Sequence, residues 1–141
     1  MTFHHPMYSP ASSRDNKEMR QQWKPLLDEF KVDLVLSGHD HAYSRTGLVD
    51  SKDIKNIPTG YQQAYDPKIG TVHVVSVSGP KMYKITKGAY AKKLGENTQL
   101  YQIIDIKKNE LRFRAYDATG DLYDEFLIQK QAGKPNLLIE K

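Results

Sequence analysis

The chain contains no cysteine, which excludes disulfide bonds and metal sites built from thiolates. It has no apolar run near the roughly 18 residues of a membrane-spanning helix, so no membrane partner is expected. No signal peptide is recognisable. Excess charge is also small, at a formal +4, and the lysines are scattered as on a solvated face. Because no nucleic-acid module accompanies this charge, we do not expect nucleic acid as a partner.

The length and the order of patterns favour one domain of the α/β (α+β) class. At 141 residues the chain can bury about two thirds of the surface that it exposes when unfolded. One amphipathic segment lies between apolar segments in the first part, and alternating segments follow in the last part. These patterns predict a mixed sheet followed by an antiparallel meander.

A helix is predicted after Ser13. Asp15 and Glu18 have the spacing of a capping box, which predicts the helix start. Pro25 removes a backbone donor, so we expect a kink or a second short helix there. Five apolar side chains repeat at helical spacing and are interpreted as core, namely Met19, Trp23, Leu26, Leu27 and Phe30.

Two nearly continuous apolar segments, 32–37 and 71–78, predict strands covered on both faces. A further short strand is expected at 46–49. The stretch 51–69 is irregular, and a loop of that length either serves a function or moves. His73 lies inside the second strand without a ligand spacing, so we interpret it as structural.

The carboxyl-terminal part alternates apolar and polar residues, as in a meander with one buried face. Strands are predicted at 100–107, 110–116 and 122–129, with turns at 108–109 and 118–121. The tail 130–141 either ends in a short strand at 137–139 or is loose.

Four of the five histidines fall in two short loops that follow apolar sequence. His39 and His41 follow the run Leu34 to Leu36, while His4 and His5 precede Pro6. Residues i and i+2 of an extended segment point to the same side, so His39 and His41 either converge on one site or point toward two adjacent ions. Loops at the carboxyl ends of strands carry the chemistry of open α/β sheets. The two loops therefore predict a metal site.

The string His-His-Pro-Met-Tyr-Ser, the helix, and Ser-Gly-His-Asp-His-Ala-Tyr-Ser-Arg together resemble the calcineurin-like metallophosphoesterases. The forms His-x-Pro-x-Tyr and His-Ala-Tyr-x-Arg resemble the purple acid phosphatase branch. The match covers 2–46 strongly and 70–83 weakly. This resemblance implies half of a four-layer α/β/β/α sandwich, with 1–141 as the carboxyl-terminal portion of the domain.

The resemblance also implies site residues. His4, His39 and His41 correspond to catalytic metal ligands, whereas His5 falls on a position that the family does not use as a ligand. The implied cofactors are two metal ions, iron, zinc or manganese, and the implied substrate is a phosphate ester. Four further positions match recurrent family positions and are expected to bind substrate, namely Tyr8, Arg14, Tyr43 and Arg45. Arg14 stands where some members place a proton-donating or phosphate-binding histidine, so no general acid is assigned.

The family's other ligands come from upstream Asp-x-His, Gly-Asp and Gly-Asn-His-Glu motifs, which this sequence lacks. Three histidines supply only part of a two-metal site, because a bridging carboxylate is also needed. We therefore expect a phosphoesterase fragment that is inactive or weakly active alone, holds partial metal or none, and pairs with an amino-terminal half or with itself. The alternative is a non-catalytic module that binds metal or phosphate weakly, or another protein. The family suggests a secreted or periplasmic location, while the sequence itself gives none.

Overall fold

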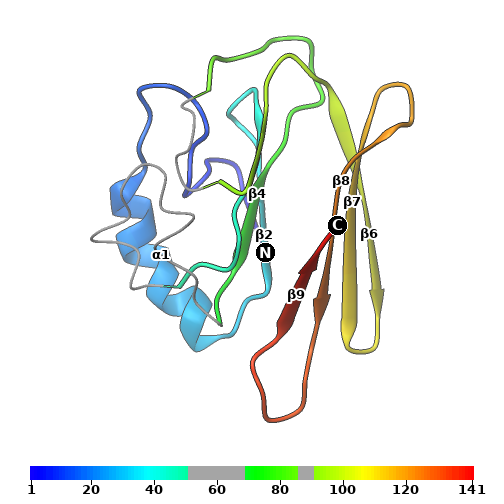
Figure 1. Cartoon of the computed structure of the whole chain (residues 1–141). Coiled ribbons are helices and arrows are strands. Elements are labelled where there is room, and N and C mark those ends of the chain that lie inside the picture. Colours follow the sequence, from blue (N-terminus) through cyan, green and yellow to red (C-terminus); the bar gives the residue numbers. More distant parts are fainter. Residues whose placement is uncertain (51–68, 86–90) are drawn as a thin grey trace.

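The computed structural model describes residues 1–50, 69–85 and 91–141. Within these ranges, two sheets face each other and helix α1 (Lys17–Glu29) covers the outer side of the first sheet (Figure 1). The prediction of an α/β (α+β) fold with a mixed sheet and a carboxyl-terminal meander is confirmed. No helix in the described ranges is long and apolar enough to cross a bilayer.

The first sheet has the order β1-β2-β4-β3-β5. Its parallel part comprises β1 (Thr2–Phe3), β2 (Leu34–Ser37) and β4 (Val72–Val75). Two short antiparallel strands, β3 (Tyr43–Arg45) and β5 (Lys93–Gly95), complete it. The strand predicted at 46–49 is wrong: β3 comes earlier, and only Val49 makes an isolated bridge, to Thr71.

The second sheet is the predicted meander, in the order β6-β7-β8-β9. Its strands are β6 (Leu100–Lys107), β7 (Glu110–Asp117), β8 (Leu122–Gln129) and β9 (Leu137–Glu140). Alternation of apolar and polar residues fixes which face each side chain occupies, so the register follows from the sequence. The tail ends in a strand, because β9 pairs with β8.

The main core lies between the two sheets. Aliphatic and aromatic side chains from both inner faces interdigitate there, and Phe113 stacks on Phe126 with ring centroids 4.7 Å apart. A second cluster joins α1 to the outer face of the first sheet through Leu27, Val35 and Met7. Trp23 packs beside this cluster, edge-on to Phe3, as a packing residue should.

The start of α1 differs from the capping-box prediction. Asn16 is the residue at the helix start and makes no side-chain cap hydrogen bond. Its side chain instead donates to the carbonyl of Pro6, and Asp15 pairs with Arg20. We expected either a kink or a second short helix at Pro25. Pro25 lies inside one continuous helix, so the second of these alternatives is wrong. Tertiary contacts along the helix outweigh the hydrogen bond that proline removes.

The apolar stripe of α1 is only partly core. Leu27 is buried, but Leu26 and Phe30 are exposed, which corrects the prediction that all five were core. Arg20 and Lys24 are buried on the inner face of the helix instead. The guanidinium of Arg20 donates to the carbonyl of Met7, and the ammonium of Lys24 donates to the carbonyl of Val49. A hydrophobicity pattern cannot reveal such residues, because it scores them as polar.

His73 on β4 is buried at 3% exposure, and neither ring nitrogen has a hydrogen-bond partner among the described residues. Burial lowers its pKa well below 6.5, and the positive charges of Lys24, Arg20 and the amino terminus lower it further. Its ring lies edge-on to Tyr8, with centroids 4.7 Å apart. The structural interpretation of His73 fits this environment.

This environment makes stability depend on pH. Below about pH 6.5 the unfolded chain takes up a proton at His73 that the folded chain excludes. The free energy of unfolding should therefore decrease as the pH is lowered, by up to about 1.4 kcal/mol per pH unit. In His73→Leu this part of the slope should vanish, and two unsatisfied nitrogens disappear as well. Urea denaturation of both proteins from pH 5 to 8 measures this difference. Parallel slopes would contradict the prediction.

Candidate metal centre

The two histidine loops leave neighbouring parallel strands at the same edge of the first sheet. Thr2 pairs with Leu36 and Phe3 with Ser37, so β1 and β2 end side by side. The amide of Gly38 donates to the carbonyl of His4 at 3.2 Å, which joins the loops directly beyond the strands. His39 adopts a left-handed backbone with φ of 61°, which turns its side chain out of the strand path.

His4 and His39 approach closely. The Nε2 atom of His4 lies 3.1 Å from the Nδ1 atom of His39, and the ring centroids are 4.9 Å apart. Two imidazole nitrogens on one ion, each 2.0–2.1 Å from it, are separated by about 2.8–3.4 Å. The observed separation therefore fits two ligands of a single ion.

His5 also belongs to the cluster, although the resemblance gave it no ligand role. One ring nitrogen from each of His4, His5 and His39 lies within 4.8 Å of the others. The ring centroid of His5 is 3.9 Å from that of His39 and 5.0 Å from that of His4. Three imidazoles are a donor set that suits zinc, copper or iron.

His41 stands apart from these three. Its Nδ1 atom lies 2.9 Å from the carbonyl oxygen of Lys81, and its ring rests on Tyr83 with centroids 4.7 Å apart. The hydrogen bond fixes the ring orientation and leaves Nε2 as the nitrogen that can bind metal. The structure thus brings His4 and His39 together and directs His41 to a neighbouring position.

Asp40, between the two histidines, anchors the loop. It is buried, accepts a short hydrogen bond from the Ser9 hydroxyl, and pairs with Arg14 at 2.7 Å. These contacts tie the Gly38–His41 loop to the segment after His4. Sequence reasoning missed Asp40 and Ser9, because Asp40 occupies the variable position of Gly-His-x-His.

The electrostatics of the loop favour neutral imidazole at His39. Desolvation lowers the pKa of His39, the charges of His5, Arg14 and His4 lower it further, and Asp40 opposes them. Metal binding requires neutral imidazole, so this environment presents His39 in its ligating form at neutral pH.

Tyr43 and Arg45 lie between the sheets and not beside the histidines. Both are buried, and both donate to Asp124 on β8 at 2.7 Å. Arg45 also pairs with Glu140 on β9 at 2.5 Å. Burial and Asp124 raise the pKa of Tyr43, so its hydroxyl stays protonated and donates. Tyr43 and Arg45 therefore lie apart from the histidine cluster, and their substrate-binding roles stay predictions.

Tyr8 is also buried, with its ring against His73 and the guanidinium of Arg20 5.4 Å from its centre. It therefore packs beside His73 and Arg20, and its substrate-binding role stays a prediction. Of the four residues expected to bind substrate, Arg14 has an exposed side chain that reaches the histidine loop through Asp40.

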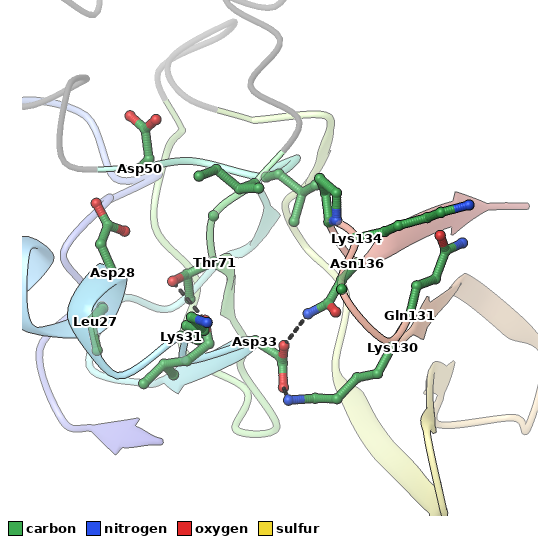
Figure 2. Close-up of a pocket in the computed structure, with 16 residues that line it drawn as sticks. Leu27, Asp28, Lys31, Asp33, Asp50, Thr71, Lys130, Gln131, Lys134 and Asn136 are labelled. Atoms are coloured by element: carbon green, nitrogen blue, oxygen red, sulfur yellow. Dashed lines mark hydrogen bonds and ion pairs between the residues drawn. The ribbon is translucent and has the colours of Figure 1, made fainter.

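A separate cavity of about 570 Å³ lies at the opposite edge of the first sheet, where β2 and β4 begin. Figure 2 shows its side chains, with Asp33 held by Lys130 and Asn136. Asp50 and Ile69 line it too, and the irregular stretch predicted at 51–69 lies, apart from Ile69, outside the described residues. None of the four histidines of the loops lines this cavity.

The sequence of the chain is similar to those of several known proteins. No family model matches the chain. An uncharacterised protein of Mycobacterium tuberculosis is 34% identical over 83 residues, which cover 54% of this chain and 16% of that protein. Purple acid phosphatase 23 of Arabidopsis thaliana is 31% identical over 86 residues, covering 60% of this chain and 16% of the plant protein. The chain resembles the purple acid phosphatases.

The fold agrees with this similarity. A purple acid phosphatase from yellow lupin seeds superimposes with a TM-score of 0.67 at 21% identity, over 91% of this chain and 24% of the lupin chain. Purple acid phosphatase 7 of Arabidopsis thaliana aligns along 92% of this chain at 23% identity. The chain spans about a sixth to a third of the length of these curated relatives.

Proposed function

We propose that this chain is the histidine-bearing, carboxyl-terminal portion of a metal-dependent phosphoesterase that uses a dinuclear centre. The 3.1 Å approach of His4 Nε2 to His39 Nδ1 is the observation that carries the proposal, because it matches two ligands on one ion. The similarity to purple acid phosphatases supports phosphate esters as substrates.

In this proposal His4 and His39 hold one ion, and His41 holds the second through Nε2, which its contact with Lys81 leaves available. Iron, zinc or manganese would supply Lewis-acid activation of the phosphate and a water of lowered pKa. Arg14 places a positive charge beside the loop, where it can attract the phosphate of the substrate. The ion pair with Asp40 holds Arg14 beside the histidine loop.

In this proposal the remaining ligands come from outside this chain. Asp40, the carboxylate next to the histidines in sequence, already accepts hydrogen bonds from Ser9 and Arg14. Uncharged imidazoles do not offset the charge of two metal ions, so bridging carboxylates are needed. We therefore propose that an amino-terminal half, or self-association, completes the centre and that the isolated chain has little activity.

Metal content tests the ligand assignment. The chain is incubated with manganese, zinc and iron, dialysed, and analysed by inductively coupled plasma mass spectrometry. His39→Ala should weaken binding on the order of 100-fold, because it removes a nitrogen of the closest pair. His73→Leu, which removes a histidine outside the cluster, is the matched control.

Metal that binds equally to the His39→Ala variant would refute the assignment. Hydrolysis of p-nitrophenyl phosphate by the loaded chain, alone and mixed with a polypeptide carrying the Gly-Asp and Gly-Asn-His motifs, tests the reaction itself. Activity only in the mixture supports a divided centre. No activity in either sample, despite bound metal, favours a non-catalytic module.

The second candidate function is that of a module that binds one metal ion without catalysis. The cluster of His4, His5 and His39 supports it, since in the part of the chain that the structure describes these three imidazoles gather without a carboxylate among them. The same measurement separates the two functions. One equivalent of metal that depends on His5 and not on His41 favours this module, whereas dependence on His41 favours the dinuclear centre.

A further inference from the structure

Strand β6 forms an open edge of the second sheet, because among the described residues it pairs with β7 alone (Figure 1). It runs from Leu100 to Lys107 without proline, and it pairs with β7 without a bulge or a register shift. Its two charged side chains are Asp105, which is paired with Arg114, and Lys107 at the turn. Proteins commonly protect a long edge with bulges, prolines or several charges, because an open edge pairs readily with another chain. Strand β6 has little of this protection.

Every second residue of β6 directs its backbone groups toward the open side. Because β6 and β7 join through a two-residue turn, hydrogen-bonded pairs alternate along the hairpin from that turn. Gln102, Ile104 and Ile106 therefore point their amides and carbonyls away from β7. Leu100 has the same orientation, and its amide donates to the carbonyl of Val77 at 2.8 Å. Within 1–50, 69–85 and 91–141, the outward groups of the other three have no backbone partner.

Apolar side chains are uncovered along the same strand. Ile106 is 71% exposed, although it lies on the same face of the sheet as Ile104, which packs against the main core. Ile103, on the opposite face, is 42% exposed. Free backbone groups and exposed apolar side chains thus coincide at this edge, and this combination favours pairing with a further strand.

The edge is complementary to itself. Ile104 is the middle one of the three residues whose backbone groups point outward. A twofold axis at Ile104 would place Gln102 of one copy opposite Ile106 of the other, and Ile104 opposite its own copy. All the free groups would then form hydrogen bonds in one antiparallel register. Ile106 would also lie diagonally across from Ile104 of the second copy, within reach of an apolar contact.

The charges and the strand ends fit this register as well. Tyr101 would lie opposite Lys107 of the second copy, where the ammonium can contact the aromatic ring. Asp105 would lie opposite Ile103 of the second copy, so no like charges face each other. Leu100, whose amide is already used, would lie beside the turn of the second copy, where its strand has ended.

We propose that two copies of this chain associate through antiparallel pairing of β6 with β6, centred on Ile104. The two meanders then form one continuous antiparallel sheet, and Ile106 of each copy becomes covered. None of these residues belongs to the histidine cluster. The pairing needs neither metal nor substrate, so it stands independently of the proposed phosphoesterase function.

Disulfide cross-linking tests the register directly, because the chain has no cysteine of its own. Positions 101 and 107 would face each other as a non-hydrogen-bonded pair with Cα atoms about 4.5 Å apart, which a disulfide can span. Both side chains are exposed, so their replacement leaves the core intact. Oxidised Tyr101→Cys/Lys107→Cys should run as a covalent dimer on a non-reducing gel. Tyr101→Cys alone should stay monomeric, since its sulfurs would be roughly 20 Å apart.

Sedimentation velocity in EDTA, over a range of chain concentrations, measures the association without covalent capture. Ile106→Lys should weaken dimerisation at least about tenfold, because it removes an apolar contact from both copies. Leu122→Lys is the matched control, since Leu122 is 53% exposed at the start of β8, away from the β6 edge. This control should change the dimerisation constant less than twofold.

A chain that stays monomeric at every concentration would overturn the proposal and leave the edge to another polypeptide. Equal weakening by Ile106→Lys and Leu122→Lys would overturn it too. The same holds for a dimer that the paired cysteines do not link, because the contact would then lie elsewhere. Because EDTA removes metal, failure of the dinuclear centre leaves these results unchanged, so the two proposals fail separately.

Discussion

Asp124→Ala should lower the free energy of unfolding by about 3–5 kcal/mol, because it leaves the buried guanidinium of Arg45 without its main partner. Asp124 accepts hydrogen bonds from both Tyr43 and Arg45, and all three side chains are buried between the sheets. These groups link β3 of the first sheet to β8 of the second. Urea denaturation followed by circular dichroism measures the change.

Arg114→Ala is the matched control for this prediction. Arg114 pairs with Asp105 across β7 and β6, but both side chains are partly exposed, so the loss should stay below about 1 kcal/mol. Replacing the whole network with Tyr43→Phe, Arg45→Met and Asp124→Leu should recover much of the stability. A loss below 1 kcal/mol in Asp124→Ala would contradict the structural role of the network.

Phe126→Ala should cost about 3–5 kcal/mol of stability through the cavity that it leaves in the core. Phe126 and Phe113 are fully buried, and their rings stack with an interplanar angle of 16°. The guanidinium of Arg45 lies 5.4 Å from the centre of the Phe126 ring, so the substitution also removes a contact of the buried network. Chemical denaturation gives the magnitude.

Ile103→Ala provides the comparison, since Ile103 on β6 is 42% exposed. Its loss should stay within about 1 kcal/mol, because little apolar surface leaves the core. If both variants lost the same stability, the described packing of the two sheets would be wrong.

Local patterns predicted the meander well. Apolar residues alternate along β6, β7 and β8, and the turn at Lys108 and Asn109 separates two strands that pair in register. The meeting of His4 and His39 also follows from local signals, since both come directly after strands that end at one edge. Short-range periodicity is sufficient for such features.

Contacts between distant segments could not be predicted. Arg45 meets Asp124 and Glu140 across the sheet interface, and nothing near Arg45 in the sequence indicates those partners. The same holds for His41, which Lys81 and Tyr83 draw away from the other histidines. Both placements have one cause, because a side chain with two possible directions is placed by its tertiary partners.

The two sheets also differ in how far apart their paired residues lie along the chain. The first three strands of the meander join through short turns, whereas in the first sheet Thr2 pairs with Leu36 and Leu34 with Val72. Closing a longer loop costs more entropy before any contact compensates for it, so non-local pairings form slowly. The meander is therefore the part that can fold by itself first. During synthesis the histidine loops emerge before it, and His41 reaches its contacts with Lys81 and Tyr83 only after that later segment has been made.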